Sequence, residues 1–325
     1  MSAPRLRQVT LKGQSFAVHE WGPETGSETG PDSAPDSGPD SVPDSGPYLL
    51  CLHGFPEYGG AWTDLAAALI ALRPDLRIIA PDQRGFGQSW APQEVADYAT
   101  GKLVGDMVAL IDALGARPAA VIGHDWGAAV AYGLAISRPD LVARLIILNG
   151  VHPVPFQRAL AAGGAQTETS QYITWLRRDG SESALAADGF ARLRAMFAAH
   201  MDMGWLSGDR LDAYLAQWAR PGRLRAMVNW YRASPLVVPA PGEAATDLPD
   251  WPLERLRVHM PHLLIWGARD TALLPEATEG LEALCADLTR VTIPGADHWL
   301  HHQRPAEIAG AITGWLDRQA AAASG

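Results

Sequence analysis

Short, almost wholly apolar runs alternate with helix-compatible segments over most of this chain. Six such runs stand at residues 48–52, 76–80, 119–122, 145–148, 262–266 and 288–293. Continuous apolar runs are typical of strands that are buried on both faces of a parallel sheet. The segments between them have the character of crossover helices, so the pattern predicts βαβ units and an α/β fold.

The start of the chain has a different pattern. Residues 8–21 alternate apolar and polar positions around Gly13, which predicts a β-hairpin. Residues 31–46 then repeat Pro-Asp-Ser-x four times. This acidic segment cannot bury enough apolar surface to offset its chain entropy, so we expect residues 24–47 to form a disordered loop, tolerated between two strands.

Between residues 151 and 254 the chain is rich in Ala, Arg, Leu and Trp, has no β-branched runs, and ends in a Pro-rich stretch. A helical block therefore interrupts the α/β pattern, which is the layout of a cap inserted into a core. We expect a first core part at residues 1–150, a helical cap at 151–254 and a second core part at 255–325.

Composition narrows the function classes. The chain has 325 residues, of which 47% are hydrophobic, so it can bury a large core. Its net charge of -10 disfavours nucleic acid and anionic membrane surfaces as partners. We find no apolar leader and no run long enough to span a membrane, and we expect a cytoplasmic protein. Cys51 and Cys285 lack metal or redox spacing, so we expect two buried thiols.

The most informative segment is residues 121–129, an apolar run that breaks at Gly-His-Asp-Trp-Gly and continues into an Ala-rich, helix-compatible stretch. It predicts a strand, a tight turn and a helix, with Asp125 at the position that serine occupies in the Gly-x-Ser-x-Gly nucleophile elbow. A carboxylate, already ionised near neutral pH, suits displacement at an electrophilic sp³ carbon and would form an alkyl ester. The alternative is that Asp125 only caps the following helix.

Three other turns follow predicted strands, at the sheet edge where open α/β folds gather their sites. The first contains Phe55, whose backbone N–H is expected to form an oxyanion hole with that of Trp126. The second ends in Asp270 and the third contains His298. The chain order nucleophile, acid, histidine matches that of α/β-hydrolases.

Taken together, these motifs resemble those of the α/β-hydrolase-fold epoxide hydrolases with an aspartate nucleophile, and the match covers nearly the whole chain. The motifs that carry it are HGFPE at 53–57, DQRGFGQS at 82–89, GHDWGA at 123–128, NWYRA at 229–233 and ADHW at 296–299. The resemblance implies a mostly parallel sheet flanked by helices with an inserted cap, and hydrolysis of a small hydrophobic epoxide to a vicinal diol. It implies no metal and no organic cofactor, and says nothing of oligomeric state.

In that family two cap tyrosines hold the epoxide oxygen and supply its proton. Tyr231 fits the NWYR pattern, and Tyr172 is the candidate for the other, with Tyr98, Tyr132 and Tyr214 as competitors. A phenol can hydrogen-bond the developing alkoxide and protonate it. His298, oriented by Asp270, is expected to activate water against the Asp125 ester.

Aromatic side chains near these turns suggest an apolar pocket, and we expect substrate contacts from Phe55, Trp126, Trp175 and Trp230. The other polar residues beside the motifs are expected to have supporting roles. His53 and His124 should support loop geometry through hydrogen bonds. His301 and His302 are expected to be exposed, and Asp297 to be a poorer partner for His298 than Asp270.

Two other classes of function stay open. Haloalkane and haloacetate dehalogenases also use an aspartate nucleophile, but this chain has Phe55 where many of the former place an asparagine, and Asn149 where the latter place the acid. A non-catalytic α/β-hydrolase module that binds a hydrophobic ligand is the remaining alternative.

Overall fold

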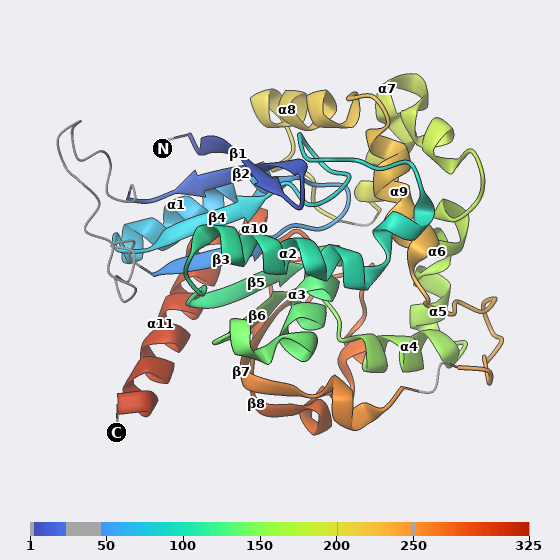
Figure 1. Cartoon of the computed structure of the whole chain (residues 1–325). Helices are drawn as coiled ribbons and strands as arrows, with labels where there is room; N and C mark the ends of the chain where they lie inside the picture. The colour runs from blue at the N-terminus through green and yellow to red at the C-terminus, as the bar shows by residue number, and fades with distance from the viewer. Residues whose placement is uncertain (1–2, 24–46, 200, 249–250, 325) are drawn as a thin grey trace.

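The computed structural model describes residues 3–23, 47–199, 201–248 and 251–324. Within these ranges eight strands form one sheet in the order β1-β2-β4-β3-β5-β6-β7-β8 (Figure 1). The strands are β1 (Arg5–Leu11), β2 (Gln14–Trp21), β3 (Tyr48–Leu52), β4 (Arg77–Pro81), β5 (Ala120–His124), β6 (Leu145–Leu148), β7 (Val258–Gly267) and β8 (Cys285–Ile293). The first two form the predicted hairpin, and β2 runs antiparallel to β4. All later neighbours are parallel, so the predicted α/β class with a mostly parallel sheet is confirmed.

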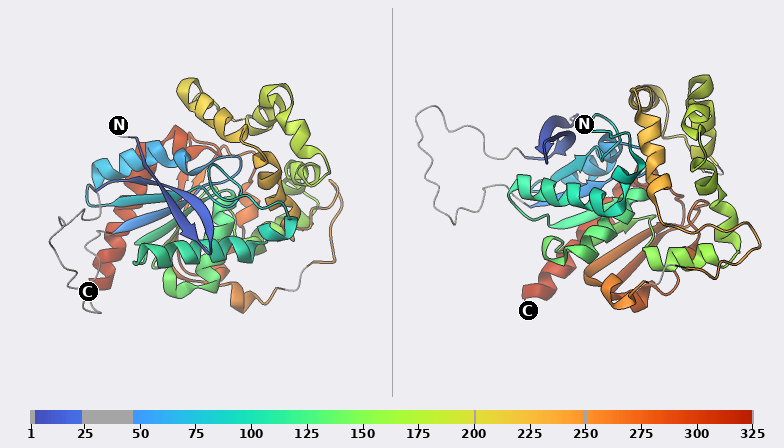
Figure 2. Two further views of the ribbon diagram at one scale, coloured as in Figure 1. Left: turned by 45° about the horizontal axis from the view of Figure 1, so that its top comes forward. Right: turned by 45° about the vertical axis from the view of Figure 1, so that its right-hand side comes forward.

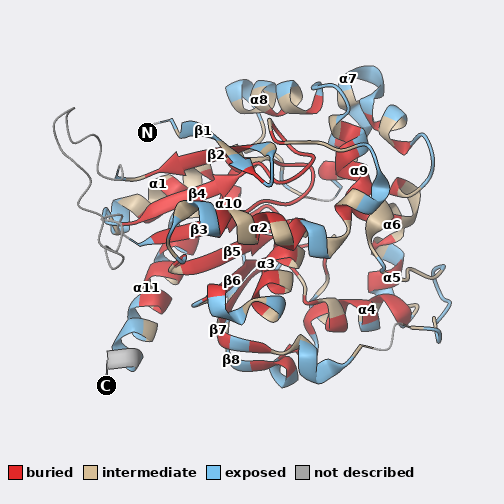
Figure 3. Cartoon of the chain, viewed as in Figure 1, coloured by how far each residue is buried: buried red, intermediate tan, exposed pale blue. Residues whose placement is uncertain are grey.

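Helices cover both faces of this sheet. On one face lie α1 (Thr63–Leu72) and α11 (Pro305–Ser324), and on the other α2 (Thr100–Leu114) and α3 (Trp126–Ser137). Side chains of successive strand residues enter opposite cores: Leu49 and Cys51 pack with α1 and α11, whereas Leu50 and Leu52 pack with α2 and α3. Figure 3 shows the buried strands between helices whose outer surfaces are exposed. This two-sided burial is why the strands read as unbroken apolar runs.

Among the described residues between β6 and β7 there are six α-helices, and we call them the helical insertion. They are α4 (Pro153–Ala161), α5 (Ala165–Thr169), α6 (Gln171–Leu176), α7 (Ser181–Phe197), α8 (Gly208–Trp218) and α9 (Arg223–Ala233), and the helical backbone of α7 breaks between Ala187 and Phe190. They gather at one side of the sheet, at the right and top of Figure 1 (see also Figure 2). The predicted division of the chain at residues 150 and 254 remains a prediction.

Short helical turns complete the described chain. They are η1 (Gly59–Trp62), η2 (Val95–Tyr98), η3 (Pro139–Leu141), η4 (Leu253–Leu256), η5 (Pro275–Thr278), η6 (Leu281–Leu284) and the four-residue helix α10 (Leu300–Gln303). Cys51 and Cys285 are free and buried, as predicted. The predicted disordered loop lies, apart from Pro47, outside the described residues. Within the described ranges, no helix has the length and apolarity that crossing a membrane requires.

Candidate active site

Asp125 stands at a sharp turn between β5 and α3. Its backbone has φ 50° and ψ -121°, in a region that residues with a Cβ rarely adopt. The flanking glycines make the turn possible, because a Cβ on Gly127 would lie 2.0 Å from the main-chain oxygen of Leu52, and one on Gly123 would meet the backbone of Ala128. This is the geometry of a nucleophile elbow. The Asp125 side chain makes no hydrogen bond that caps α3.

The Asp125 carboxylate is held from two sides. The main-chain N–H of Phe55 donates to Oδ1 at 2.7 Å. Oδ2 lies 3.6 Å from Nε2 of His298. The three residues come from the ends of β3, β5 and β8, so the expected convergence at one sheet edge is what the structure shows.

His298 is bound on its other nitrogen by Asp270. Nδ1 lies 2.8 Å from Oδ2 of Asp270, which follows β7. Asp297, the sequence neighbour of His298, instead accepts from the main-chain N–H groups of Asp202 and Trp299. The structure therefore places Asp270, and not Asp297, against the imidazole.

Burial and the attraction between the two side chains determine the charges of His298 and Asp270. Burial lowers the pKa of His298, but the carboxylates of Asp270 and Asp125 outweigh it and raise the pKa to about 10. Burial raises the pKa of Asp270, while His298 and donors such as the Leu273 amide bring it below its usual value. The arrangement is an imidazolium between two carboxylates.

The residue that fixes Asp270 is one whose role sequence reasoning missed. Asn149, directly after β6, donates from Nδ2 to Asp270 Oδ2 at 2.5 Å and accepts at Oδ1 from the Gly267 amide at 2.6 Å. From the sequence alone, Asn149 is only a position that lacks a carboxylate. Its place at the end of a predicted strand, beside the ends of β5 and β7, is the signal that could have pointed to it.

Two cavities meet at Asp125, Tyr172 and Tyr231. The first, which we call the His298 cavity, has a volume of about 180 Å³. The second, the Trp126 cavity, has a volume of about 260 Å³ and a more apolar lining. The His298 cavity is also lined by Phe55, Met196, Phe197, Met201 and Trp299, and the Trp126 cavity by Trp126, Ile136, Val151, Phe156, Leu236 and Trp251.

The tyrosines of both cavities come from the helical insertion, Tyr172 from α6 and Tyr231 from α9. Their rings lie 6.0 Å apart, edge to face, and the Tyr231 ring also packs on Phe55 and Trp126. Burial raises the pKa of both phenols above the usual value, so both carry a proton.

The three competing tyrosines lie elsewhere. The hydroxyl of Tyr98 donates to the carbonyl of Pro92, that of Tyr132 contacts His262, and that of Tyr214 donates to Glu57. None of the three lines either of the two cavities at Asp125. The structure thus brings Tyr172 and Tyr231 to Asp125 and leaves their competitors outside.

Two of the expected substrate contacts need correction, because Trp175 and Trp230 line neither cavity. The indole N–H of Trp230 donates to the carbonyl of Arg84, and its ring is fully buried against Phe86. The Trp175 ring packs under the guanidinium of Arg192. Trp230 therefore joins α9 to the core and Trp175 joins α6 to α7, whereas Phe55 and Trp126 do line the cavities.

The predicted exposure of His301 and His302 is wrong, since both are buried. The short helix α10 turns them inward, where His301 packs on Trp62 and His302 stacks on Trp205. The prediction for His53 and His124 is confirmed in its geometry. His53 accepts from the Gln83 amide and contacts the Gly54 carbonyl, and His124 contacts the main-chain oxygen of His298.

Comparison with known proteins agrees with this geometry. The model of the family described as "alpha/beta hydrolase fold" matches residues 47–305. The chain belongs to this family. One relative, "AB hydrolase superfamily protein YfhM" of Bacillus subtilis (strain 168), is 31% identical over 275 residues, which are 84% of this chain and 91% of the relative.

Within the family, the resemblance to epoxide hydrolases is confirmed. "Epoxide hydrolase 4" of Homo sapiens is 30% identical over 270 residues, 80% of this chain and 69% of the relative. A solved structure described as "Novel epoxide hydrolases belonging to the alpha/beta hydrolases superfamily in metagenomes from hot environments" is 33% identical and superposes with a TM-score of 0.80. It covers 97% of this chain and 99% of its own.

Proposed function

We propose that this protein hydrolyses hydrophobic epoxides to vicinal diols through a covalent ester on Asp125. The observation that carries the proposal is the meeting of two cavities at the partly buried Asp125 carboxylate, with two protonated phenols, Tyr172 and Tyr231, on the side of the helical insertion. The relatives named epoxide hydrolases support it. The apolar lining of both cavities supports a hydrophobic substrate.

In the first half-reaction a carboxylate oxygen of Asp125 attacks a ring carbon of the epoxide. A carbon–oxygen bond of the ring breaks, and the electron pair passes to the ring oxygen. Tyr172 and Tyr231 hydrogen-bond that oxygen, and one of them supplies its proton. The product of this step is a hydroxyalkyl ester of Asp125.

In the second half-reaction water attacks the carbonyl carbon of the ester. His298 takes a proton from the water, and Asp270 stabilises the imidazolium that forms. The Phe55 amide donates to Oδ1 of the free carboxylate, which supports the proposal that it hydrogen-bonds the tetrahedral oxyanion, with the Trp126 amide as its proposed partner. As the intermediate collapses, the carbon–oxygen bond to the alcohol breaks and the departing oxygen takes the proton from His298, which releases the diol. The remaining proton of the carboxylic acid returns to the phenolate, so the Asp125 carboxylate and both tyrosines are restored.

The test is diol formation from styrene oxide and a few aliphatic epoxides by the wild type and by Asp125→Ala, with Asp287→Ala as the control. Asp287 is an exposed carboxylate on β8 that lines neither cavity. We expect diol from the wild type and the control and none from Asp125→Ala. Halide release from chloroacetate and a bromoalkane is measured in parallel, and halide without diol would replace the proposal with a dehalogenase. If neither diol nor halide forms from any substrate, the non-catalytic ligand-binding module is favoured.

Two further measurements address the covalent step. In His298→Gln the ester should accumulate, and intact-protein mass spectrometry should find one epoxide added to the peptide that contains Asp125. A single wild-type turnover in ¹⁸O-water should place the label in the Asp125 carboxylate, because water attacks the ester carbonyl. Label found only in the diol would mean direct attack of water on the epoxide.

A further inference from the structure

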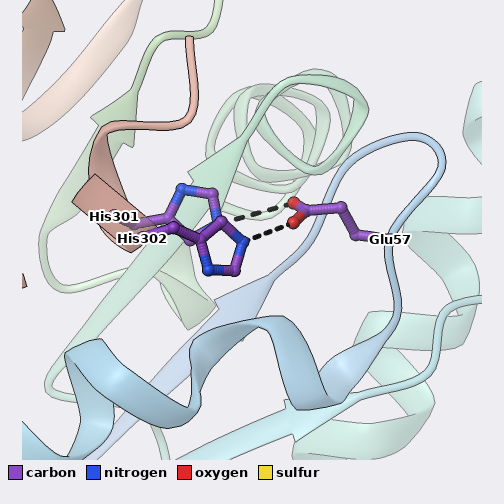
Figure 4. Close-up of side chains that lie close together, drawn as sticks. All are labelled: Glu57, His301 and His302. Carbon is purple, nitrogen blue, oxygen red and sulfur yellow. Dashed lines mark hydrogen bonds and ion pairs between the residues drawn. The ribbon is translucent and has the colours of Figure 1, made fainter. Parts of the chain in front are cut away.

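A buried cluster beside His298 is not accounted for by the proposed reaction. It consists of Glu57, His124, Tyr214, His301 and His302, and we call it the Glu57 cluster. All five side chains are buried. Figure 4 shows the Glu57 carboxylate pointing at the rings of His301 and His302. The cluster joins the β3–η1 loop, the end of β5, α8 of the helical insertion and α10.

The Glu57 carboxylate has close partners on both oxygens. Oε1 accepts from the Tyr214 hydroxyl at 2.9 Å and lies 2.7 Å from Nε2 of His302. Oε2 lies 3.2 Å from Nδ1 of His124 and 3.5 Å from Nε2 of His301. The His301 contact does not have hydrogen-bond geometry. The second oxygen of the carboxylate therefore depends on His124.

The contact between Glu57 Oε2 and His124 Nδ1 needs one more proton than a neutral His124 ring carries. Nε2 of His124 lies 2.9 Å from the main-chain oxygen of His298. A carbonyl oxygen only accepts, so Nε2 must carry a hydrogen. A neutral imidazole then has a bare lone pair at Nδ1, and that lone pair would face the ionised Glu57 carboxylate. Two acceptors do not hold each other at 3.2 Å in a buried site, so a proton lies between them.

The proton belongs on His124. Burial raises the pKa of Glu57, but the neighbouring histidines outweigh it and hold that pKa well below its usual value. Nδ1 of His302 and both ring nitrogens of His301 have no hydrogen-bond partner, so a second proton on either ring would be buried without an acceptor, and burial lowers the pKa of both. His302 then donates its single proton to Glu57, and His124 is left as the charged partner.

A metal ion is the other way to bring such donors together, since Glu57, His301 and His302 have ligand atoms within 4.8 Å of one another. The distance between the Glu57 and His302 ligand atoms does not fit a metal site. Two ligands of a tetrahedral zinc ion, each about 2.0–2.2 Å from the metal, lie about 3.3 Å apart. The 2.7 Å between His302 and Glu57 is the spacing of a hydrogen bond.

We propose that Glu57 is a positioning residue for His298: it keeps His124 doubly protonated, and the His124 imidazolium anchors the main-chain carbonyl of His298. A charge-assisted hydrogen bond is about twice as strong as a neutral one. The hydrogen bond from His124 therefore fixes His298, whose Nε2 lies 3.6 Å from Oδ2 of Asp125. The consequence for turnover rests on the proposed function, whereas the charge of His124 does not.

The first test is the ¹H–¹⁵N spectrum of the histidine side chains in the wild-type protein, assigned with His124→Gln. We expect both ring nitrogens of His124 to be protonated, and only one in Glu57→Gln. The glutamine can keep every hydrogen bond, because its amide N–H can donate to Nδ1 of a neutral His124. A single protonated nitrogen on His124 in the wild type would overturn the proposal, as would a metal ion bound stoichiometrically to the purified protein.

The second test separates positioning from packing. In single-turnover experiments Glu57→Gln should slow ester hydrolysis roughly tenfold and leave ester formation within about twofold. His302→Gln is the matched control in the same cluster, since its amide can still donate to Glu57 and the His124–His298 contact is untouched. Hydrolysis at the wild-type rate in Glu57→Gln would overturn the positioning role. Absence of any ester in His298→Gln would instead refute the covalent step of the proposed function and leave the spectrum to decide the charge of His124.

Discussion

His298 enters the reaction with a charge that it must lose before it can act as a base. With Asp270 on one nitrogen and Asp125 near the other, its pKa is about 10, so the free protein holds an imidazolium. Esterification of Asp125 removes one of the two negative charges. Because fewer carboxylates then favour the proton, the pKa of His298 falls in the ester, and the base is generated by the step that precedes its use.

The same charge makes stability depend on pH. Unfolded His298 has a pKa near 6.5 and the folded residue one of about 10. The stabilisation from this proton is fully present below about pH 6.5 and is lost as the pH rises to about 10, because the unfolded state releases it first. We expect the melting temperature of the wild type to fall more steeply over this window than that of His298→Gln. Parallel curves for the two proteins would contradict the raised pKa.

The two cavity tyrosines should affect only ring opening. Replacing Tyr231 or Tyr172 by phenylalanine removes one donor to the developing alkoxide, and each change should slow ester formation roughly tenfold to a hundredfold. Stopped-flow measurement of alkylation would show it, with ester hydrolysis little changed. Tyr98→Phe is the control, since its hydroxyl donates to Pro92 away from the cavities. An unchanged alkylation rate in Tyr231→Phe would remove that residue from the site.

At the scale of elements, the ends of β5, β6 and β7 are joined through one residue. The main-chain oxygen of Asn149 accepts from the Asp125 amide, and its own amide donates to Ile265. Its side chain bridges Gly267 and Asp270. The backbone at Asn149 has φ 33°, a left-handed conformation that asparagine tolerates better than most residues. Asn149 therefore fixes the position of the turn at Asp125 relative to Asp270.

Two substitutions separate the side chain of Asn149 from its backbone. Asn149→Gly keeps the positive φ and loses both side-chain hydrogen bonds to β7 and Asp270, so ester hydrolysis should slow about tenfold. Asn149→Ala should do the same and also cost about 1 kcal/mol or more of stability, because alanine is strained at positive φ. Single-turnover kinetics and urea denaturation measure the two effects. Wild-type hydrolysis in Asn149→Gly would mean that Asp270 needs no help from this side chain.

At the scale of the whole molecule, the apolar runs predict the sheet well. The sequence predicts the buried polar contacts poorly. The predicted runs 48–52 and 145–148 coincide with β3 and β6, and the other four strands differ from their runs by a few residues at the ends, because apolar patterning follows burial on both faces. The motifs also placed Asp125, Asp270 and His298 at one edge. The Glu57 cluster was missed because its members come from segments up to 245 residues apart, and nothing local in HGFPE or in HWLHH reveals a partner.

The aromatic residues show the same limit. Phe55 and Trp126 adjoin turns that must lie at the site, so their positions could be predicted from the chain. Trp175 and Trp230 lie on helices, where the rotation of the helix decides which face meets the cavity. That rotation is fixed by distant contacts, such as the Trp230 indole on the carbonyl of Arg84.

The strands that flank the Pro-Asp-Ser repeat in the sequence, β2 and β3, end and begin far from the site. The register pairs Trp21, the last residue of β2, with Ile78, and Tyr48, the first residue of β3, with Arg77. All four stand at the amino end of the parallel strands, whereas Asp125, Asp270 and His298 follow their carboxyl ends. Deleting residues 29–45 shortens the segment that joins Trp21 to Tyr48 in the sequence, and both of these residues lie at the opposite end of the strands from Asp125, Asp270 and His298.

We therefore expect this deletion to leave kcat and KM for epoxides within about twofold of the wild type, since loop length has only a weak effect on stability. The six residues that remain between Pro23 and Pro47 form the shortened connection. A variant in which residues 29–45 are replaced by glycine and serine at equal length is the control for composition. If the deletion lowers kcat in a protein that melts at the wild-type temperature while the replacement does not, the length of the segment matters to turnover. If both lower it, the acidic repeat itself has a role in the reaction.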